Sequence, residues 1–154
     1  MRPGYGDSAG ALAVERPVRK DLPMAHPRMF EDDDPWLARV RSIALALPGA
    51  QEKISHGRPA FFTDRVHCYY GASLTVDGQW EQHPQCVVLH LPPAETAALQ
   101  EEPRTFSPAY LGAAGWIGVD LDAHTDLVEL AELIEESYRR VAPRRLVAEL
   151  DAGR

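Results

Sequence analysis

The sequence predicts an α+β fold, in which one compact domain has a largely antiparallel sheet with helices on one face. The length of 154 residues suits a single domain with a sizeable core. Segments rich in β-branched and aromatic residues follow one another with turn formers between them, which is typical of an antiparallel meander. Helical patterns flank these segments, so the predicted order of elements is α-β-β-β-α-β-α-α.

The chain divides into a predicted flexible arm, residues 1–29, and a domain of residues 30–154. The arm is rich in Pro, Gly, Ala and charge and shows no amphipathic period. In the domain, acidic residues precede Pro35, and apolar residues then recur at helical spacing. We therefore expect a first helix over residues 34–47, which the following "PG" ends.

Three strands are expected next, in "AFFTD", in "RVHCYYGASLTV" and, after the polar connection "DGQWEQHPQ", in "CVVLHL". The prolines and helix formers of "PPAETAALQEE" predict a short helix over residues 93–101, and "GWIGVDLD" predicts one more strand. Thr125 is the expected N-cap of the longest helix, which ends before Pro143. The segment "PRRLVAEL" is expected to form a last short helix.

Charge restricts the classes of partner that the domain can hold. The net charge is −7, and residues 1–29 carry five Lys or Arg against three acids, which leaves 11 against 20 in the remainder. Nonspecific nucleic-acid affinity comes from Lys and Arg that neutralise phosphates. Any nucleic-acid site in the domain is therefore expected to be a local basic patch.

Several other classes of protein are not supported. No apolar run approaches the roughly 18 residues of a membrane helix, and the N-terminus has no apolar signal core, so we expect a cytoplasmic protein with no membrane partner. The two cysteines have no CxxC spacing, which suits a reducing compartment. Neither GxGxxG nor a P-loop occurs, and no cofactor is expected.

Metal binding and catalysis are weakly supported. Three histidines and two cysteines lie within 24 positions and resemble zinc ligands in spacing: His67, Cys68, His83, Cys86 and His90. Ordinary strand residues are the favoured interpretation, since free cysteine behaves as a small hydrophobe. A GxSxG elbow and an obvious Cys–His pair are both absent, so we expect a protein that is not an enzyme.

Four arginines form the only dense basic cluster: Arg139, Arg140, Arg144 and Arg145. They straddle a predicted helix end, where cations complement the helix dipole. The cluster is open to two interpretations, simple helix termination or an edge that contacts phosphates through planar guanidinium groups.

The stretch "SHGRPAFF" reads first as a turn that leads into a strand. Gly57 allows a change in the sign of φ, and Pro59 biases Arg58 towards extended backbone. His56 and Arg58 are then left either to brace a neighbouring loop or to hold an anion. Further along, Tyr110 and Trp116 bracket a Gly-Ala loop, as core aromatics or as a stacking platform.

Three blocks taken together, "LALPGAQEKISHGRPAFF", "FSPAYLGAAGWIGVDL" and "IEESYRRVAPRRLVAEL", resemble the MmcQ/YjbR family of small bacterial proteins over roughly residues 35–150. The resemblance implies a compact α+β fold related to frataxin-like and secretion-chaperone-like arrangements, and a double-wing DNA-binding role. Family positions fall on His56, Gly57, Pro59, Phe61, Tyr110, Gly115, Trp116, Ser137 and Tyr138. Where similar proteins often have basic residues before "GW", this chain has Ala113 and Ala114.

Two functions are therefore expected, from different classes. The first is a non-enzymatic DNA-binding domain that presents basic side chains to phosphates: Arg58, Arg65, Arg139, Arg140, Arg144 and Arg145. The second is an adaptor or a small-ligand module for an anionic group, with a pocket built from His56, Arg58, Tyr110, Trp116, Ser137 and Tyr138. A continuous basic ridge would favour the first function, and a pocket that gathers the "HGRP" turn and the Trp116 loop would favour the second.

Overall fold

The structure is a computed structural model that describes residues 27–154. The predicted arm of residues 1–29 lies outside the described residues, except for its last three. Within residues 27–154, none of the helices has the length and apolar character needed to cross a membrane.

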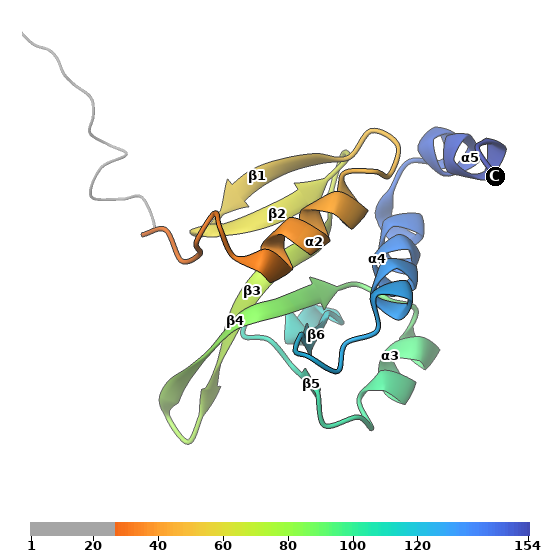
Figure 1. Ribbon diagram of the computed structural model, residues 1–154. Coiled ribbons are helices and arrows are strands. Elements are labelled where there is room, and N and C mark those ends of the chain that lie inside the picture. Colours follow the sequence, from red (N-terminus) through yellow and green to blue (C-terminus); the bar gives the residue numbers. More distant parts are fainter. Residues whose placement is uncertain (1–26) are drawn as a thin grey trace, which may run out of the picture.

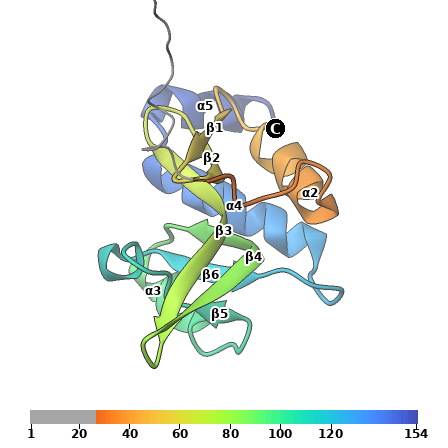
Figure 2. The same ribbon diagram turned by 90° about the vertical axis from the view of Figure 1, so that its left-hand side faces the viewer.

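Six antiparallel strands form one sheet in the order β1-β2-β3-β4-β6-β5 (Figure 1). Their bounds are β1 Gln51–Ser55, β2 Arg58–Phe62, β3 Val66–Val76, β4 Gln79–Leu89, β5 Thr105–Phe106 and β6 Ile117–Asp120. The long strands β3 and β4 form a twisted hairpin whose tip extends away from the helices (Figures 1 and 2). The helices cover the middle of the sheet, whereas the tip of the hairpin is exposed (Figure 1).

Four α-helices contribute to the main core on one face of the sheet: α2 Pro35–Ala44, α3 Pro93–Leu99, α4 Leu127–Val141 and α5 Arg144–Ala152. Helix α4 supplies Leu130, Ile134 and Tyr138 to this core, and α2 supplies Leu37 and Val40. The predicted α+β class, with helices on one face of an antiparallel sheet, is thus confirmed.

The opposite face of the sheet has a smaller apolar cluster and, among residues 27–154, no α-helix. Ala72, Cys86 and Val88 are buried there, beneath partly buried side chains that include Tyr69 and Trp116. The segment between β5 and β6 covers this cluster and contains one short 3-10 turn, η2 Gly112–Ala114. A loop in place of a helix leaves part of this face open.

Two tight hairpin turns explain why two predicted strand boundaries were wrong. The turn His56-Gly57 joins β1 to β2, and the turn Asp77-Gly78 joins β3 to β4; all four residues have positive φ, as a type I′ turn requires. Strand β1 was not predicted, since "QEKIS" is polar and lies at the sheet edge. The stretch expected as a polar connection is instead the exposed first half of β4.

Smaller corrections concern the ends of elements. The two-residue strand β5 was not predicted, since it is too short to show a period. Helices α2 and α3 end earlier than expected, at Ala44 and Leu99. The N-cap of α4 is Asp126 and not Thr125, because the Asp126 carboxylate accepts the amide hydrogens of Val128 and Glu129.

Candidate functional site: a groove beside the β1–β2 turn

A groove of about 830 Å³ lies on the sheet face that carries the small apolar cluster. The β1–β2 turn, the β3–β4 hairpin and the loop that leads into η2 form its walls. Its lining residues are Met29, Ser55, His56, Arg58, Tyr69, Gly71, Ala72, Ser73, Trp80, Gln82, Val88, Pro108, Ala109, Tyr110 and Leu111. The groove thus joins segments that are up to about 80 positions apart in the sequence.

Arg58 crosses the groove floor from β2 to β4. Its Nη2 donates a hydrogen bond to Gln82 Oε1 at 2.7 Å, so the side chain passes over the intervening strand β3. The lack of a side chain at Gly71, where the β3–β4 register shifts, makes this possible, because a Cβ on Gly71 would lie only 2.6 Å from Arg58 Nη1. The glycine in β3 and the amide in β4 together fix the position of the guanidinium group.

The charge of Arg58 has no counter-ion within the described part of the chain. No carboxylate of residues 27–154 forms an ion pair with it, and its one hydrogen-bond partner, Gln82, is neutral. Burial lowers the pKa of this guanidinium, which is nevertheless always protonated in proteins. A half-buried cation without a carboxylate partner favours the approach of an anion.

Three aromatic side chains supply the apolar part of the groove. Tyr110 and Trp80 are 86% and 56% exposed, which is unusual for large rings. Tyr69 is half-buried, and burial raises the pKa of its phenol. These rings offer faces on which a flat molecule could stack.

Backbone conformation holds two groove residues in place. His56 and Tyr110 have φ values of 52° and 66°, a left-handed conformation that few non-glycine residues adopt. The Ala109 amide donates to Ser73 O at 2.9 Å, which fixes the Tyr110 loop against β3. The Met29 amide donates to Gly57 O at 2.9 Å, so residues 27–29 lie against the β1–β2 turn.

The residues expected to share one pocket do not all line the groove. His56, Arg58 and Tyr110 line the groove. Trp116 lies on the same face of the sheet but does not line the groove; its ring is 5.3 Å from that of Tyr69 and 5.0 Å from that of His90. Ser137 and Tyr138 are fully buried on α4 and do not line the groove.

Ser137 and Tyr138 have structural partners. Ser137 Oγ donates to His67 O at 2.5 Å and accepts from the His90 amide at 2.9 Å. Tyr138 Oη donates to Pro48 O at 2.6 Å. These bonds join α4 to the sheet and to the loop after α2, which is a physical reason for serine and tyrosine at these positions.

The six arginines expected to contact phosphates do not form one ridge. Arg58 begins β2, a strand about 16 Å long, whereas Arg65 lies beyond its other end, just before β3. Arg139 is neutralised by Glu135 at 2.9 Å and by Asp151 at 2.6 Å, and these hydrogen bonds raise its pKa. Figure 1 shows α5, which follows Arg139, at the opposite end of the domain from the β1–β2 turn.

Arginines without a carboxylate partner surround the junction of α4 and α5. Within residues 27–154, none of Arg65, Arg140, Arg144 and Arg145 forms an ion pair. Arg65 donates to Val141 O at 3.3 Å, and Arg140 Nε donates to His90 Nδ1 at 3.2 Å. Burial and the nearby Arg140 lower the pKa of His90.

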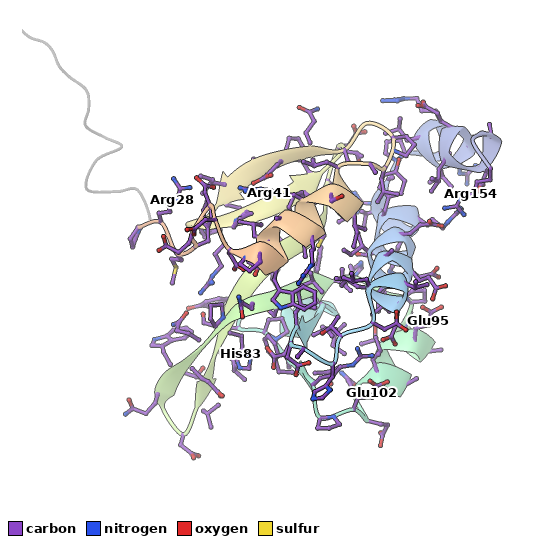
Figure 3. All side chains as sticks on the ribbon, in the orientation of Figure 1. Arg28, Arg41, His83, Glu95, Glu102 and Arg154 are labelled. Atoms are coloured by element: carbon purple, nitrogen blue, oxygen red, sulfur yellow. The ribbon has the colours of Figure 1, made fainter. Side chains whose placement is uncertain are left out.

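The five histidines and cysteines with zinc-like spacing are dispersed. Cys68 is in the main core and Cys86 in the small cluster on the other face, and burial raises the pKa of both thiols. His83, marked in Figure 3, bonds Asp120 at 2.7 Å and stacks on Phe106. Among residues 27–154, no three His, Cys, Asp or Glu side chains are grouped so as to hold a metal ion.

Sequence reasoning missed four residues that shape the groove: Tyr69, Gly71, Trp80 and Gln82. Two signals for them exist in the sequence. A lone glycine inside the apolar strand pattern indicates a bulge or a close backbone approach. The dipeptide "DG" before "QWEQ" indicates a two-residue hairpin, which places Trp80 on a strand.

Comparisons with known proteins concern the same region. The family model described as YjbR matches residues 45–140, more than half of the chain and every groove residue except Met29. The crystal structure of the Deinococcus radiodurans protein DR2400, with a domain described as DUF419, is similar with a TM-score of 0.53 and 21% identity. The match covers 75% of this chain and 87% of that one, and at this identity it concerns the fold. No curated protein matches the chain significantly.

Proposed function

The chain belongs to the YjbR family, and within that fold we propose that it is a binding module whose groove takes a small molecule with an anionic group. The proposal involves no chemical step on the ligand. The β1–β2 turn and the loop before η2 act as the two walls, and the β3–β4 hairpin acts as the floor.

The observation that carries this proposal is the Arg58 guanidinium in the groove. It is half-buried, it has no carboxylate partner in the described chain, and Gln82 and Gly71 hold it in place. A hydrogen bond between a charged donor and an anion contributes about 1.5–3 kcal/mol. Preorganisation adds to this, because little side-chain entropy remains to be lost when the ligand binds.

The size and lining of the groove agree with such a ligand. Small-molecule sites commonly have volumes of about 300–1,000 Å³ and combine mostly apolar walls with a few polar groups. Here Val88, Pro108, Leu111 and the three aromatic rings are the apolar part. Ser55, Ser73 and Gln82 add polar groups that can orient a ligand.

An NMR titration with an anionic aromatic probe, 8-anilinonaphthalene-1-sulfonate, tests the proposal. We expect saturable shifts of the backbone amides that line the groove, above all Gly71, Ala72, Ser73 and Leu111. Arg58→Gln should weaken binding about 10-fold or more, since it removes the charged donor. Arg39→Gln removes an equal charge from α2 and is the matched control.

Two results would contradict the groove proposal. One is the absence of saturable binding. The other is a set of shifts confined to residues outside the groove, with equal affinities for the Arg58→Gln and Arg39→Gln variants.

We also propose a second candidate function, weak contact with the phosphates of duplex DNA at the junction of α4 and α5. The observation that favours it is the set of guanidinium groups there that have no carboxylate partner in the described chain, those of Arg65, Arg140, Arg144 and Arg145. The net charge of −7 opposes long-range attraction, so such binding would depend on these few contacts.

Fluorescence anisotropy of a labelled duplex, measured with the full chain at low and at near-physiological salt, tests the DNA proposal. Binding should weaken as salt rises, because each phosphate contact releases a counter-ion. The double substitution Arg144→Gln and Arg145→Gln should abolish it, whereas Arg39→Gln should leave it unchanged. No binding at low salt, or binding that does not respond to salt, would exclude this function.

A further inference from the structure

The chemistry of the groove also specifies the class of its ligand. We infer that the ligand is a flat aromatic or conjugated molecule with one carboxylate, bound with the carboxylate on Arg58 and the ring among Tyr69, Trp80 and Tyr110. This inference rests on the proposed function of the groove and further specifies the charge of the ligand's anionic group and the shape of the rest of the ligand.

The number of Lys and Arg side chains in the groove favours a ligand with a single negative charge. Arg58 is the only Lys or Arg among the described residues that line it, and no α-helix begins at its walls. A phosphate monoester carries nearly two charges at neutral pH and has three strong acceptor oxygens. One guanidinium group would leave part of that charge unpaired in a half-buried site, in a protein whose own net charge is −7.

The geometry of Arg58 favours a carboxylate. A guanidinium group has five N–H donors in one plane, and two parallel donors match the two oxygens of a carboxylate. The bond from Nη2 to Gln82 and the close approach of Nη1 to Gly71 restrict rotation of that plane. The remaining donors therefore keep a fixed direction, which suits recognition of a planar anion.

The aromatic side chains that line the groove favour a flat ligand over a globular one. Tyr110 and Trp80 line the groove from two separate segments, one from the loop before η2 and the other from the β3–β4 hairpin. Both rings are largely exposed to water. A ligand that stacks on them would bury their apolar faces. A planar ring covers such faces with more buried area per atom than a saturated ring of similar size.

A series of ligands that differ in one feature each tests this inference on the full chain by isothermal titration calorimetry. The four probes are 1-naphthoate, 1-naphthyl phosphate, neutral 1-naphthalenemethanol and saturated cyclohexanecarboxylate. We expect 1-naphthoate to bind about 10-fold or more tightly than each of the other three. Arg58→Gln should remove the difference between 1-naphthoate and the alcohol.

Substitution of an aromatic wall provides the second arm. Trp80→Ala should weaken 1-naphthoate at least 5-fold and leave the affinity for cyclohexanecarboxylate nearly unchanged. The side chain is exposed on the hairpin, so its loss is not expected to prevent folding. Arg39→Gln on α2 should change neither affinity.

The possible outcomes separate this inference from the function on which it rests. If none of the four probes binds, the small-ligand function of the groove fails as well. If 1-naphthyl phosphate binds best, or the alcohol binds as well as 1-naphthoate, the groove binds ligands but the carboxylate class is wrong. If cyclohexanecarboxylate equals 1-naphthoate, the requirement for a flat ring is wrong.

Discussion

His67 is a buried polar side chain without a hydrogen bond from either ring nitrogen in the described chain. It is the extra residue of a β-bulge at the start of β3, and its ring lies edge-on to the Tyr138 ring, with the ring centroids 5.2 Å apart. Burial without a partner disfavours the charged imidazolium and lowers the pKa of His67 to about 4. The histidine is therefore neutral in the folded protein at neutral pH.

Acid is predicted to destabilise the fold through His67. The unfolded histidine takes up a proton near pH 6.5, whereas the folded one does so only near pH 4. The unfolded state therefore binds more protons between these values, and the free energy of unfolding falls as pH decreases through this range. The loss attributable to this group is on the order of 3 kcal/mol.

Urea denaturation of the parent and of His67→Leu, at pH 7.5 and at pH 4.5, measures this contribution. The variant should be as stable as the parent at pH 7.5, or up to about 1 kcal/mol more stable, because an apolar side chain replaces an unpartnered polar one. Its loss of stability at pH 4.5 should be clearly smaller. Equal losses in both proteins would show that other groups cause the acid sensitivity.

At the scale of the element, β3 contains a glycine whose function differs from that of the hairpin glycine that follows it. Gly71 and Gly78 have nearly the same φ, 83° and 79°. A Cβ at Gly71 would collide with Arg58 Nη1, whereas a Cβ at Gly78 would have no neighbour within 4 Å. Substitution of both glycines introduces backbone strain, but only substitution of Gly71 affects the groove. A comparison of the two variants therefore separates the two effects.

Alanine substitutions at these two glycines are predicted to differ in binding. Each should lower the free energy of unfolding by about 1 kcal/mol, the usual cost of a left-handed alanine. Only Gly71→Ala should also weaken the binding of 1-naphthoate, since it displaces the guanidinium group. Thermal denaturation and calorimetry check the two effects, and equal affinities in the two variants would mean that the position of Arg58 is unimportant.

On the scale of the whole molecule, Ser137 connects the main helix to two strands of the sheet. Its hydroxyl donates to a carbonyl at the start of β3 and accepts an amide hydrogen just after β4. Figure 2 shows α4 passing behind these strands. This bond pair sets the distance between the helix layer and the sheet.

Ser137→Ala is predicted to lower the free energy of unfolding by about 1–3 kcal/mol, because two buried backbone groups lose their partner. Ser42→Ala, at an exposed position on α2, should change it by less than about 0.5 kcal/mol. Chemical denaturation of both variants gives the comparison. A cost for Ser137→Ala no greater than that for Ser42→Ala would mean that solvent replaces the lost hydrogen bonds.

Local features of the sequence were sufficient for the fold class and the family. The apolar spacing from Leu127 to Val141 follows the helical period, and "HGRPAF", "YLG" and "SYR" occur in the order of the family. These features predicted the α+β class, which the structure confirms, and the YjbR family, which the family model confirms. Helix and strand preferences depend on residues that are close together in the sequence, so they can be recognised from the sequence pattern alone. The same reasoning missed β1 and β5, which have no apolar period of their own.

The tertiary structure alone decided where the groove lies. Arg58 meets Gln82 only because β2, β3 and β4 are adjacent and Gly71 has no side chain to block the path of Arg58 across β3. Trp80 and Tyr110 share a groove only because the loop before η2 hydrogen-bonds to β3. Strand register, bulges and loop docking depend on contacts between distant residues, and no local pattern specifies them.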